Sequence, residues 1–450
     1  MPESVVVPPN THGHLLRILG VTFGVAVAIG GMIGAGILRT PSSIAALVPD
    51  AGLIVALWVL GALQAALEAN VFSELGTAMP KAGGLYVYAH RAFGDVGGLA
   101  VGWTVWCARL SSAAALSVAF TDFLALVWPF AGAHSTAVAL AMLVAIFGLN
   151  AVGVREGSSV QKATSFAKAL ALAAFCIVAF AAASPSSAAA PAMAAPAIGL
   201  MGAVGAYQMI VGAYSGWYEP LFFAEENTDP AKNIPRAMFI GIAVGAVLYV
   251  SVNLGLIHAL GVRGMAQGAL PYTTILSRAI GPAAGTLFAI GAMIIVASCT
   301  NAGVMTAPRV LLGLARDRLL PARLADVNRG GSPWIAMLMT AAGAMLLALI
   351  GVLDKGVFSL LFGLIGTLSV AAQLLTIAAI FVLRRREPGM ARPYRALGYP
   401  WLPAFALAVD AALLLLFLEA DWLGALIAAT LWAACIPFAW IARRARAVTA

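Results

Sequence analysis

Charged residues are scarce in this sequence. They occupy 10% of the 450 positions, whereas hydrophobic residues occupy 62% and the mean hydropathy is +0.97. Soluble domains carry about a quarter charged residues, so a polytopic membrane protein is predicted. A bilayer accepts only helices or closed barrels, and the apolar runs here reach about 20 residues without alternation. The spans are therefore predicted to be helical.

Cysteine and catalytic patterns are also sparse. The four cysteines, Cys107, Cys176, Cys299 and Cys435, lie in apolar runs without paired spacing, which indicates neither a disulfide framework nor a zinc site. No Ser/His/Asp order, metal-ligand spacing or phosphate loop stands out. We therefore expect no enzyme activity, no cofactor and no metal. The first apolar run is too long for a signal peptide and is expected to remain as a span.

Twelve spans are predicted, with boundaries good to a few residues. They lie at residues 16–38, 53–76, 96–127, 135–152, 158–183, 199–223, 237–260, 282–312, 334–352, 357–383, 402–418 and 423–441.

The loop charges predict the orientation. With the amino terminus inside, the outer loops hold few basic residues: Arg39, Arg263, Arg278 and Lys355. The inner loops and tail hold Lys81, Arg91, Arg155, Lys162, Lys232, Arg236, Arg316, Arg318, Arg323, Arg329, Arg384, Arg385, Arg386, Arg392, Arg395, Arg443, Arg444 and Arg446. This asymmetry places both termini in the cytoplasm and the chain in the cell membrane. The basic residues are then topology signals, and no nucleic-acid partner is expected.

A glycine cluster interrupts the first apolar run. Residues 28–37 read Ala-Ile-Gly-Gly-Met-Ile-Gly-Ala-Gly-Ile. Glycine costs a helix interior about 1 kcal/mol relative to alanine, so the cluster indicates a helix that stops and restarts at mid-membrane depth. Backbone groups freed there must meet protein, water or a bound solute. Close packing against a neighbouring helix is the alternative explanation of the same glycines.

The sixth run is interrupted in the same way. Residues 209–220 contain Gly212 and Gly216, followed by Glu219 and Pro220. Paired interruptions in two halves of a chain point to an inverted-repeat transporter with its substrate between the halves. A channel would also tolerate broken helices, but paired breaks in a long chain fit alternating access better.

The two breaks also predict the chemistry of the substrate. The amides of Gly34, Ala35 and Gly36 would face an anion at the positive end of a half-helix. Half-helices that end near Gly30 and Ala213 would offer carbonyl groups to a cation. A solute with a carboxylate and an ammonium on one carbon fits both, and that solute is an amino acid.

Four sequence blocks carry a family resemblance. Residues 33–37, Ile-Gly-Ala-Gly-Ile, resemble the Ile-Gly-Ser-Gly-Ile element of the amino acid-polyamine-organocation superfamily, especially its L-type amino-acid transporter branch. The other blocks are residues 73–76 with 80–88, residues 216–217 with 224–226 and 233–236, and residues 301–303 with 315–321. The resemblance extends over roughly residues 15–440.

The resemblance implies an all-helical LeuT-type fold, a five-plus-five inverted repeat with helices 1 and 6 broken, plus two accessory helices. The implied organisation is a cytoplasmic segment at 1–15, a ten-helix core at 16–383 with repeats at about 16–183 and 199–383, accessory helices at 384–441 and a cytoplasmic tail at 442–450. The implied activity is sodium-independent uniport, exchange or proton-coupled uptake of amino acids. We predict a neutral or broad-range substrate; a cationic amino acid or a polyamine is the alternative.

The resemblance also implies the site residues. Gly34, Ala35 and Gly36 would bind the substrate carboxylate. Ala35 replaces the usual serine, and Gly212 lies where a gating phenylalanine is common, so Tyr214 or Trp217 is the candidate lid. The full set of candidate substrate-binding residues is Ile29, Gly30, Met32, Ile33, Gly34, Ala35, Gly36, Val211, Gly212, Ala213, Tyr214, Ser215, Trp217 and Glu219.

Ionisable residues within the spans are candidate coupling or gating groups. A lysine inside a helix costs at least about 2.5 kcal/mol on insertion scales, so Lys168 either snorkels to the interface or faces a cavity. The resemblance places it where sodium-coupled relatives bind sodium, which predicts no sodium requirement and a link to protons. Glu68 would either pair with Arg109 or relay protons. Glu219 would face the substrate or the inner gate, or merely stabilise a half-helix start. The set is Lys168, Glu68, Arg109 and Asn301.

No obligate partner subunit is expected. L-type relatives pair with a glycoprotein through an external cysteine, and this chain has no cysteine in a predicted outer loop. The expected partners are the amino-acid substrate, the lipid bilayer and protons.

Overall fold

The structure is a computed structural model that describes residues 15–182, 199–267, 271–353 and 355–420, with scattered positions beyond 420. The predicted twelfth span at 423–441 and both terminal segments lie essentially outside the described residues. The helices are α1 Val21–Met32, α2 Ala35–Leu47, α3 Ala51–Ala78, α4 Leu85–Ala125, α5 Phe130–Ala133, α6 Ser135–Val152, α7 Val154–Ala181, α8 Leu200–Tyr214, α9 Pro230–Gln267, α10 Pro271–Ile280, α11 Ala284–Arg316, α12 Trp334–Leu353, α13 Lys355–Arg386 and α14 Trp401–Ala420. Within the described ranges, the 3₁₀ segments are η2 Glu219–Phe223, η3 Gly281–Ala283 and η4 Ala322–Ala325.

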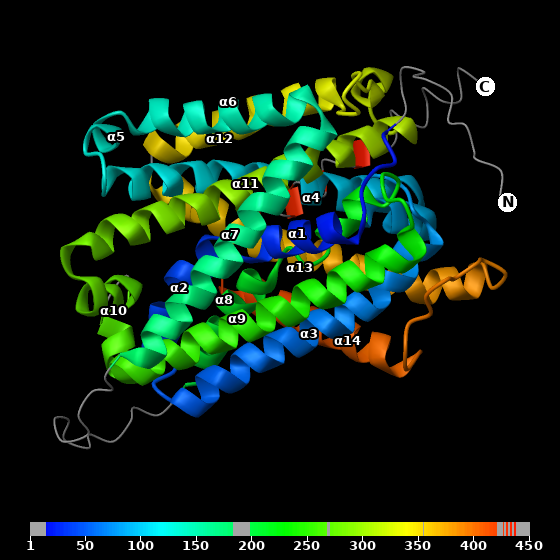
Figure 1. The fold of residues 1–450 in the computed structure, drawn as a ribbon. Helices are drawn as coiled ribbons and strands as arrows, with labels where there is room; N and C mark the ends of the chain where they lie inside the picture. The colour runs from blue at the N-terminus through cyan, green and yellow to red at the C-terminus, as the bar shows by residue number, and fades with distance from the viewer. Residues whose placement is uncertain are drawn as a thin grey trace, which may run out of the picture.

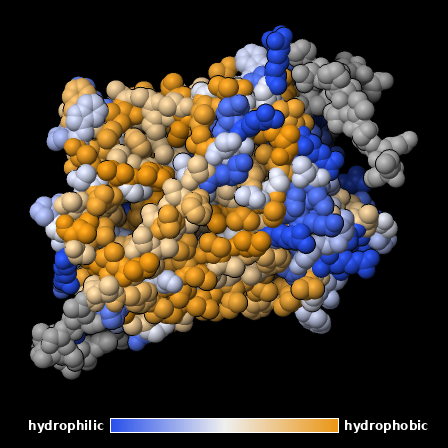
Figure 2. Space-filling model, viewed as in Figure 1, coloured by the Kyte–Doolittle hydropathy of each residue, from blue (hydrophilic) through white to orange (hydrophobic). Residues whose placement is uncertain are grey.

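The prediction of an all-helical membrane protein is confirmed for the described residues. Nine helices there are long and apolar enough to cross a bilayer, and α1 with α2, bent by 43° between them, makes a tenth if the pair is counted as one span. No strand occurs in these ranges apart from one isolated bridge between Leu19 and Asn227. Figure 2 shows an apolar band across the middle of the molecule and hydrophilic side chains gathered at the right-hand end. The count of twelve spans and the inverted repeat stay predictions.

The broken helices lie inside the bundle. α4 packs against α11, α12 and α13, while α3 packs against α9 (Figure 1). Between these groups, α1 contacts α7, α9 and α11, and α2 contacts α8 and α9. The interrupted segments are therefore surrounded by protein, as freed backbone groups at membrane depth require.

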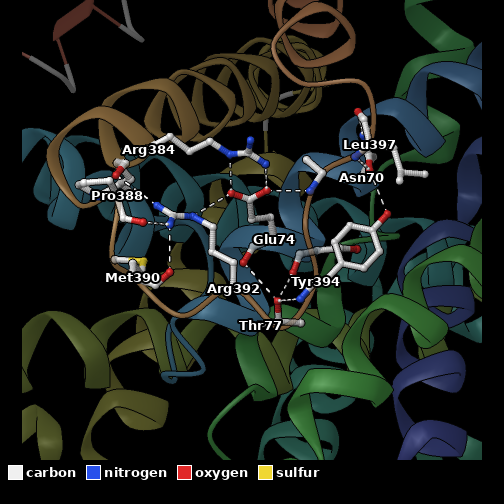
Figure 3. A network of polar contacts seen from close by, with 12 residues as sticks. Asn70, Glu74, Thr77, Arg384, Pro388, Met390, Arg392, Tyr394 and Leu397 are labelled. Carbon is white, nitrogen blue, oxygen red and sulfur yellow. Dashed lines mark hydrogen bonds and ion pairs between the residues drawn. The ribbon is translucent and has the colours of Figure 1, made fainter.

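A polar anchor joins the loop after α13 to α3 (Figure 3). Glu74 on α3 is 1% exposed and receives Arg384 Nη2 at 2.5 Å, Arg392 Nε at 3.1 Å and the amide of Ala396 at 2.7 Å. One turn away, Asn70 Oδ1 accepts the amide of Leu397 at 2.8 Å. The start of α14 is thereby fixed to α3.

Candidate functional site

The break between α1 and α2 leaves backbone carbonyl groups without helical partners. Lys168 on α7 reaches them: its Nζ lies 2.7 Å from the oxygens of both Gly30 and Ile33. Tyr249 on α9 donates to the oxygen of Met32 at 2.7 Å. The Lys168 side chain is fully buried, so it does not snorkel to the interface. At this helix end the carbonyl groups expected to bind the substrate's ammonium group are therefore bonded to Lys168 instead.

Both explanations of the glycine cluster apply, and Gly31 meets both. A Cβ on Gly30 would lie 2.0 Å from Gln161 Nε2, and one on Gly31 would lie 3.0 Å from the backbone of Gly216. These two glycines permit close packing. Gly31 also lines a cavity, together with Gly34 and Gly36 beyond the break.

The second break follows Tyr214 at the end of α8. Gly216 has φ +118°, and a Cβ there would lie 2.5 Å from the carbonyl carbon of Gly31. A side chain is excluded both by the backbone conformation and by the contact. The hydroxyl of Tyr249 is also 3.0 Å from the oxygen of Ala213, so one side chain joins the two breaks.

A cavity of about 440 Å³ lies beside the two breaks, within the range of small-molecule sites. Of the predicted residues, those that line it are Met32, Gly34, Gly36, Gly212, Ala213, Ser215 and Arg109. The predicted residues absent from its described lining are Ile29, Gly30, Ile33, Val211, Tyr214, Trp217, Glu219, Lys168, Glu68 and Asn301. Ala35 begins α2, and its side chain lies outside the described part of the structure.

Several lining residues were missed by the sequence prediction. They are Gly31, Thr40, Val105, Ala108, Ser112, Ala115, Leu116, Gly205, Gln208, Met209, Tyr218, Cys299, Gly303, Gly366 and Ser369. Thr40 Oγ1 is buried without a hydrogen-bond partner, so it is free to bind a polar group in the cavity. Ser112 lies three residues from Arg109, one turn along α4, and this spacing was the available signal. Gly31, Ala108 and Met209 lie within three residues of predicted site residues, whereas Cys299, Gly303, Gly366 and Ser369 come from helices far along the chain.

The predicted aromatic lid does not cover this cavity. The hydroxyl of Tyr214 donates to the oxygen of Trp58 at 3.1 Å, and Trp217 packs against Phe72 with ring centroids 5.1 Å apart. Both side chains are buried away from the cavity, and each packs against another aromatic ring. Tyr218 lines the cavity in their place, and a Cβ on Gly212 would meet no atom within 4 Å.

Arg109 and Glu219 form an ion pair, with Arg109 Nη1 2.6 Å from Glu219 Oε1. Glu219 is fully buried and lies behind the cavity lining, so the prediction that it faces the substrate is not met. Arg109 also does not pair with Glu68, as one interpretation proposed, because the carboxylate of Glu219 is already beside it. Its guanidinium lies 5.6 Å from the ring centre of Tyr218.

Asn301 belongs to an amide network behind α1. It donates to Gln161 Oε1 at 2.8 Å and accepts from Asn150 at 2.7 Å, linking α11 to α7 and α6. Ser165 on α7 then donates to the oxygen of Ala26 at 2.6 Å. The network holds α7, and with it Lys168, against α1.

Comparison with known proteins agrees with this architecture. The amino acid permease family model matches residues 20–440. The chain is 26% identical to a serine/threonine exchanger, SteT, from Bacillus subtilis, over 88% of this chain and 89% of that protein. It is 28% identical to Asc-type amino acid transporter 1 from Mus musculus, over 85% and 73%. It is also 26% identical to large neutral amino acids transporter small subunit 2 from Oryctolagus cuniculus, over 85% and 72%. A cavity beside two broken helices and a match along nearly the whole chain lead to one conclusion: the protein belongs to the amino acid permease family.

Proposed function

We propose that this protein is a sodium-independent secondary transporter of neutral amino acids that works by alternating access. The observation that carries the proposal is the Lys168 ammonium held by the carbonyls of Gly30 and Ile33. A fixed cation at this helix end occupies the place that a bound metal cation would need. Relatives named as amino acid transporters support the substrate class.

The cavity lining favours a neutral side chain. Among the described residues that line the cavity, Arg109 is the only charged one, and Glu219 offsets its charge. No carboxylate of that lining is available to bind a second ammonium group, which argues against a polyamine. In our proposal the α-carboxylate binds at the start of α2, near Gly34 and Gly36, where helix amides point.

The remaining features of the proposal concern the membrane and partners. We infer that both termini are cytoplasmic, that residues 16–383 form a core of two inverted repeats, and that the chain works without an obligate second subunit. Cys107, Cys176 and Cys299 lie within the helices α4, α7 and α11 rather than in a loop. This position supports the inference that no second subunit is attached through a disulfide.

Transport assays with purified protein in liposomes test the proposal. Uptake of a panel of radiolabelled amino acids would be measured with and without internal amino acid, sodium and a pH gradient. We expect uptake of neutral amino acids that is unchanged when sodium is replaced by choline. Strict dependence on sodium would overturn the role given to Lys168, and uptake of polyamines alone would overturn the substrate class.

A further inference from the structure

A second polar cluster lies outside the cavity, where α3, α8 and α14 meet. Glu68 on α3 and Asp410 on α14 are 3% and 1% exposed. Gln64 lies between them: its Nε2 is 2.9 Å from Glu68 Oε1 and 3.0 Å from Asp410 Oδ1. Tyr207 on α8 donates to Gln64 Oε1 at 2.5 Å. None of these four side chains belongs to the described lining of the cavity.

The cluster holds two acids and no compensating cation. Because Glu68 and Asp410 lie against the same amide nitrogen, their carboxyl groups fall within the range of about 6 Å over which charges strongly influence each other's ionisation. In the described ranges, no lysine or arginine is paired with either group. Two such carboxylates at membrane depth do not both stay ionised.

The other groups around the cluster do not supply a positive charge. From α8 the facing titratable group is Tyr207, and from the turn after α8 it is Tyr218. Beyond Tyr218 lie Arg109 and Glu219, which are paired with each other. The described residues of α9 and α13 contribute no charged group that is bonded to either acid.

The donors and acceptors around Glu68 and Asp410 leave room for one additional proton between the two acids. Gln64 uses its amide donors on Glu68 and Asp410, and Tyr207 uses its hydroxyl on Gln64. Asp410 Oδ2 is buried and has no hydrogen-bond partner. A carboxylate only accepts hydrogen bonds, whereas a carboxylic acid also donates one. One proton between the acids would therefore satisfy the unpaired oxygen.

We propose that Glu68 and Asp410 form a proton-binding site in which the two carboxyl groups share one proton. The proton is taken from water and returned to water, and no other bond forms or breaks. Burial prevents exchange in this conformation, so α8 or α14 must move away from α3 before the proton leaves.

The site is connected to the cavity through α8. Tyr207 is bonded to Gln64, which bridges the two acids, and Gly212 and Ala213 on the same helix line the cavity. Loss of the proton leaves two adjacent negative charges, which favours a conformation that admits water to α8. The role of this proton in a transport cycle rests on the function proposed above; the site itself does not.

Infrared spectroscopy of the purified full-length protein tests the site directly. At neutral pH we expect a carbonyl band of a protonated carboxyl group that shifts in heavy water. Glu68→Gln and Asp410→Asn should each remove this same band. The introduced amide donates a hydrogen bond to the remaining carboxyl group in place of the shared proton, and the remaining group then stays ionised. The double variant should remove nothing further. Asp326→Asn changes an exposed acid and should leave the band intact.

Transport by the same variants separates the two proposals. We expect wild-type uptake to vary with pH and this dependence to be lost in Glu68→Gln, which retains the shape of a protonated glutamate. A band unaffected by either single variant overturns the proton site, even if amino acids are transported. A band that behaves as expected in a protein that transports no amino acid upholds the site and overturns the transport function.

Discussion

At the scale of single residues, Lys168 is a buried charge whose cost in free energy is offset by hydrogen bonds. Its ammonium is buried, yet it is bonded to two carbonyl groups that the end of α1 leaves unpaired. A buried acceptor without a partner costs about 1–3 kcal/mol. The lysine and the helix break therefore stabilise each other.

Replacing Lys168 by methionine should destabilise the protein and abolish uptake. The change leaves the oxygens of Gly30 and Ile33 unpaired, at a cost of roughly 2–6 kcal/mol for the two together. Thermal unfolding in detergent and liposome uptake measure the two effects. Lys162→Met, an exposed change on the same helix, is the control and should alter neither. A Lys168→Met variant as stable and active as the wild type would contradict this role.

Gly212 determines how much space the cavity offers. A Cβ at this position meets no atom within 4 Å, so a larger side chain would extend into the cavity. Gly212→Leu should therefore fold normally but reduce uptake of large neutral amino acids by at least about tenfold, equivalent to about 1.4 kcal/mol of binding. Uptake of small amino acids should fall much less.

Competition assays against a small radiolabelled substrate measure this change in specificity. Gly291→Leu on α11 is the matched control, because a Cβ at Gly291 is equally unobstructed but Gly291 is absent from the described cavity lining. An equal loss of uptake for every substrate size would show that Gly212 affects folding or movement rather than the volume of the site.

At the scale of elements, the ion pairs that join the loop after α13 to α3 all involve one buried acid. Glu74 binds Arg384, Arg392 and the amide of Ala396. Removing one partner of a buried ion pair costs roughly 3–5 kcal/mol, and less here because the Arg384 side chain keeps 23% of its exposure to solvent.

Glu74→Gln should release this loop from α3. The arginines lose their counter-charge, so trypsin should cleave after Arg395 faster than in the wild type. The bond after Arg392 precedes Pro393 and resists trypsin. Arg395→Gln, an exposed change in the same loop, should leave the anchor intact and slow cleavage only at its own position. Unchanged digestion of Glu74→Gln would mean that backbone contacts alone hold the loop.

The sequence predicts the helix breaks better than it predicts the contacts across them. Glycines mark both interruptions, and α1 and α8 end at Met32 and Tyr214, within two residues of where Gly30 and Ala213 were expected to end them. The partners of the buried charges were not predicted, because a helical pattern gives the buried face of a helix but not the side chain opposite it. Asp410, which lies beside Glu68, is 342 positions later in the chain.

At the scale of the whole molecule, the apolar band and the distribution of basic residues predict an orientation that can be measured. With the natural cysteines replaced, a cysteine at His134 should react with a membrane-impermeant maleimide on intact cells. A cysteine at Asp326 should react only after permeabilisation. Both positions are exposed on the protein surface, so a difference in labelling reports the side of the membrane rather than burial. The reverse labelling pattern would contradict the positive-inside assignment.

The family and the general architecture were predictable from the sequence because apolar runs and four short blocks extend along the chain. The cavity was only partly predictable. Its lining combines residues of α1 and α2 with residues of α4, α8, α11 and α13, and the last four helices meet the first two only after the bundle has assembled. Ser369 on α13 and Cys299 on α11 gave no local signal of this position.

The ion pair of Arg109 and Glu219 also bears on the electrical behaviour of the carrier. The two charges cancel beside the cavity, and a zwitterion adds no net charge when it enters. Moving one elementary charge through a membrane potential involves about 2.3 kcal/mol per 100 mV. Exchange of one zwitterion for another avoids this energy entirely, so membrane voltage would neither drive nor oppose it. A substrate with a charged side chain would make the same movement electrogenic.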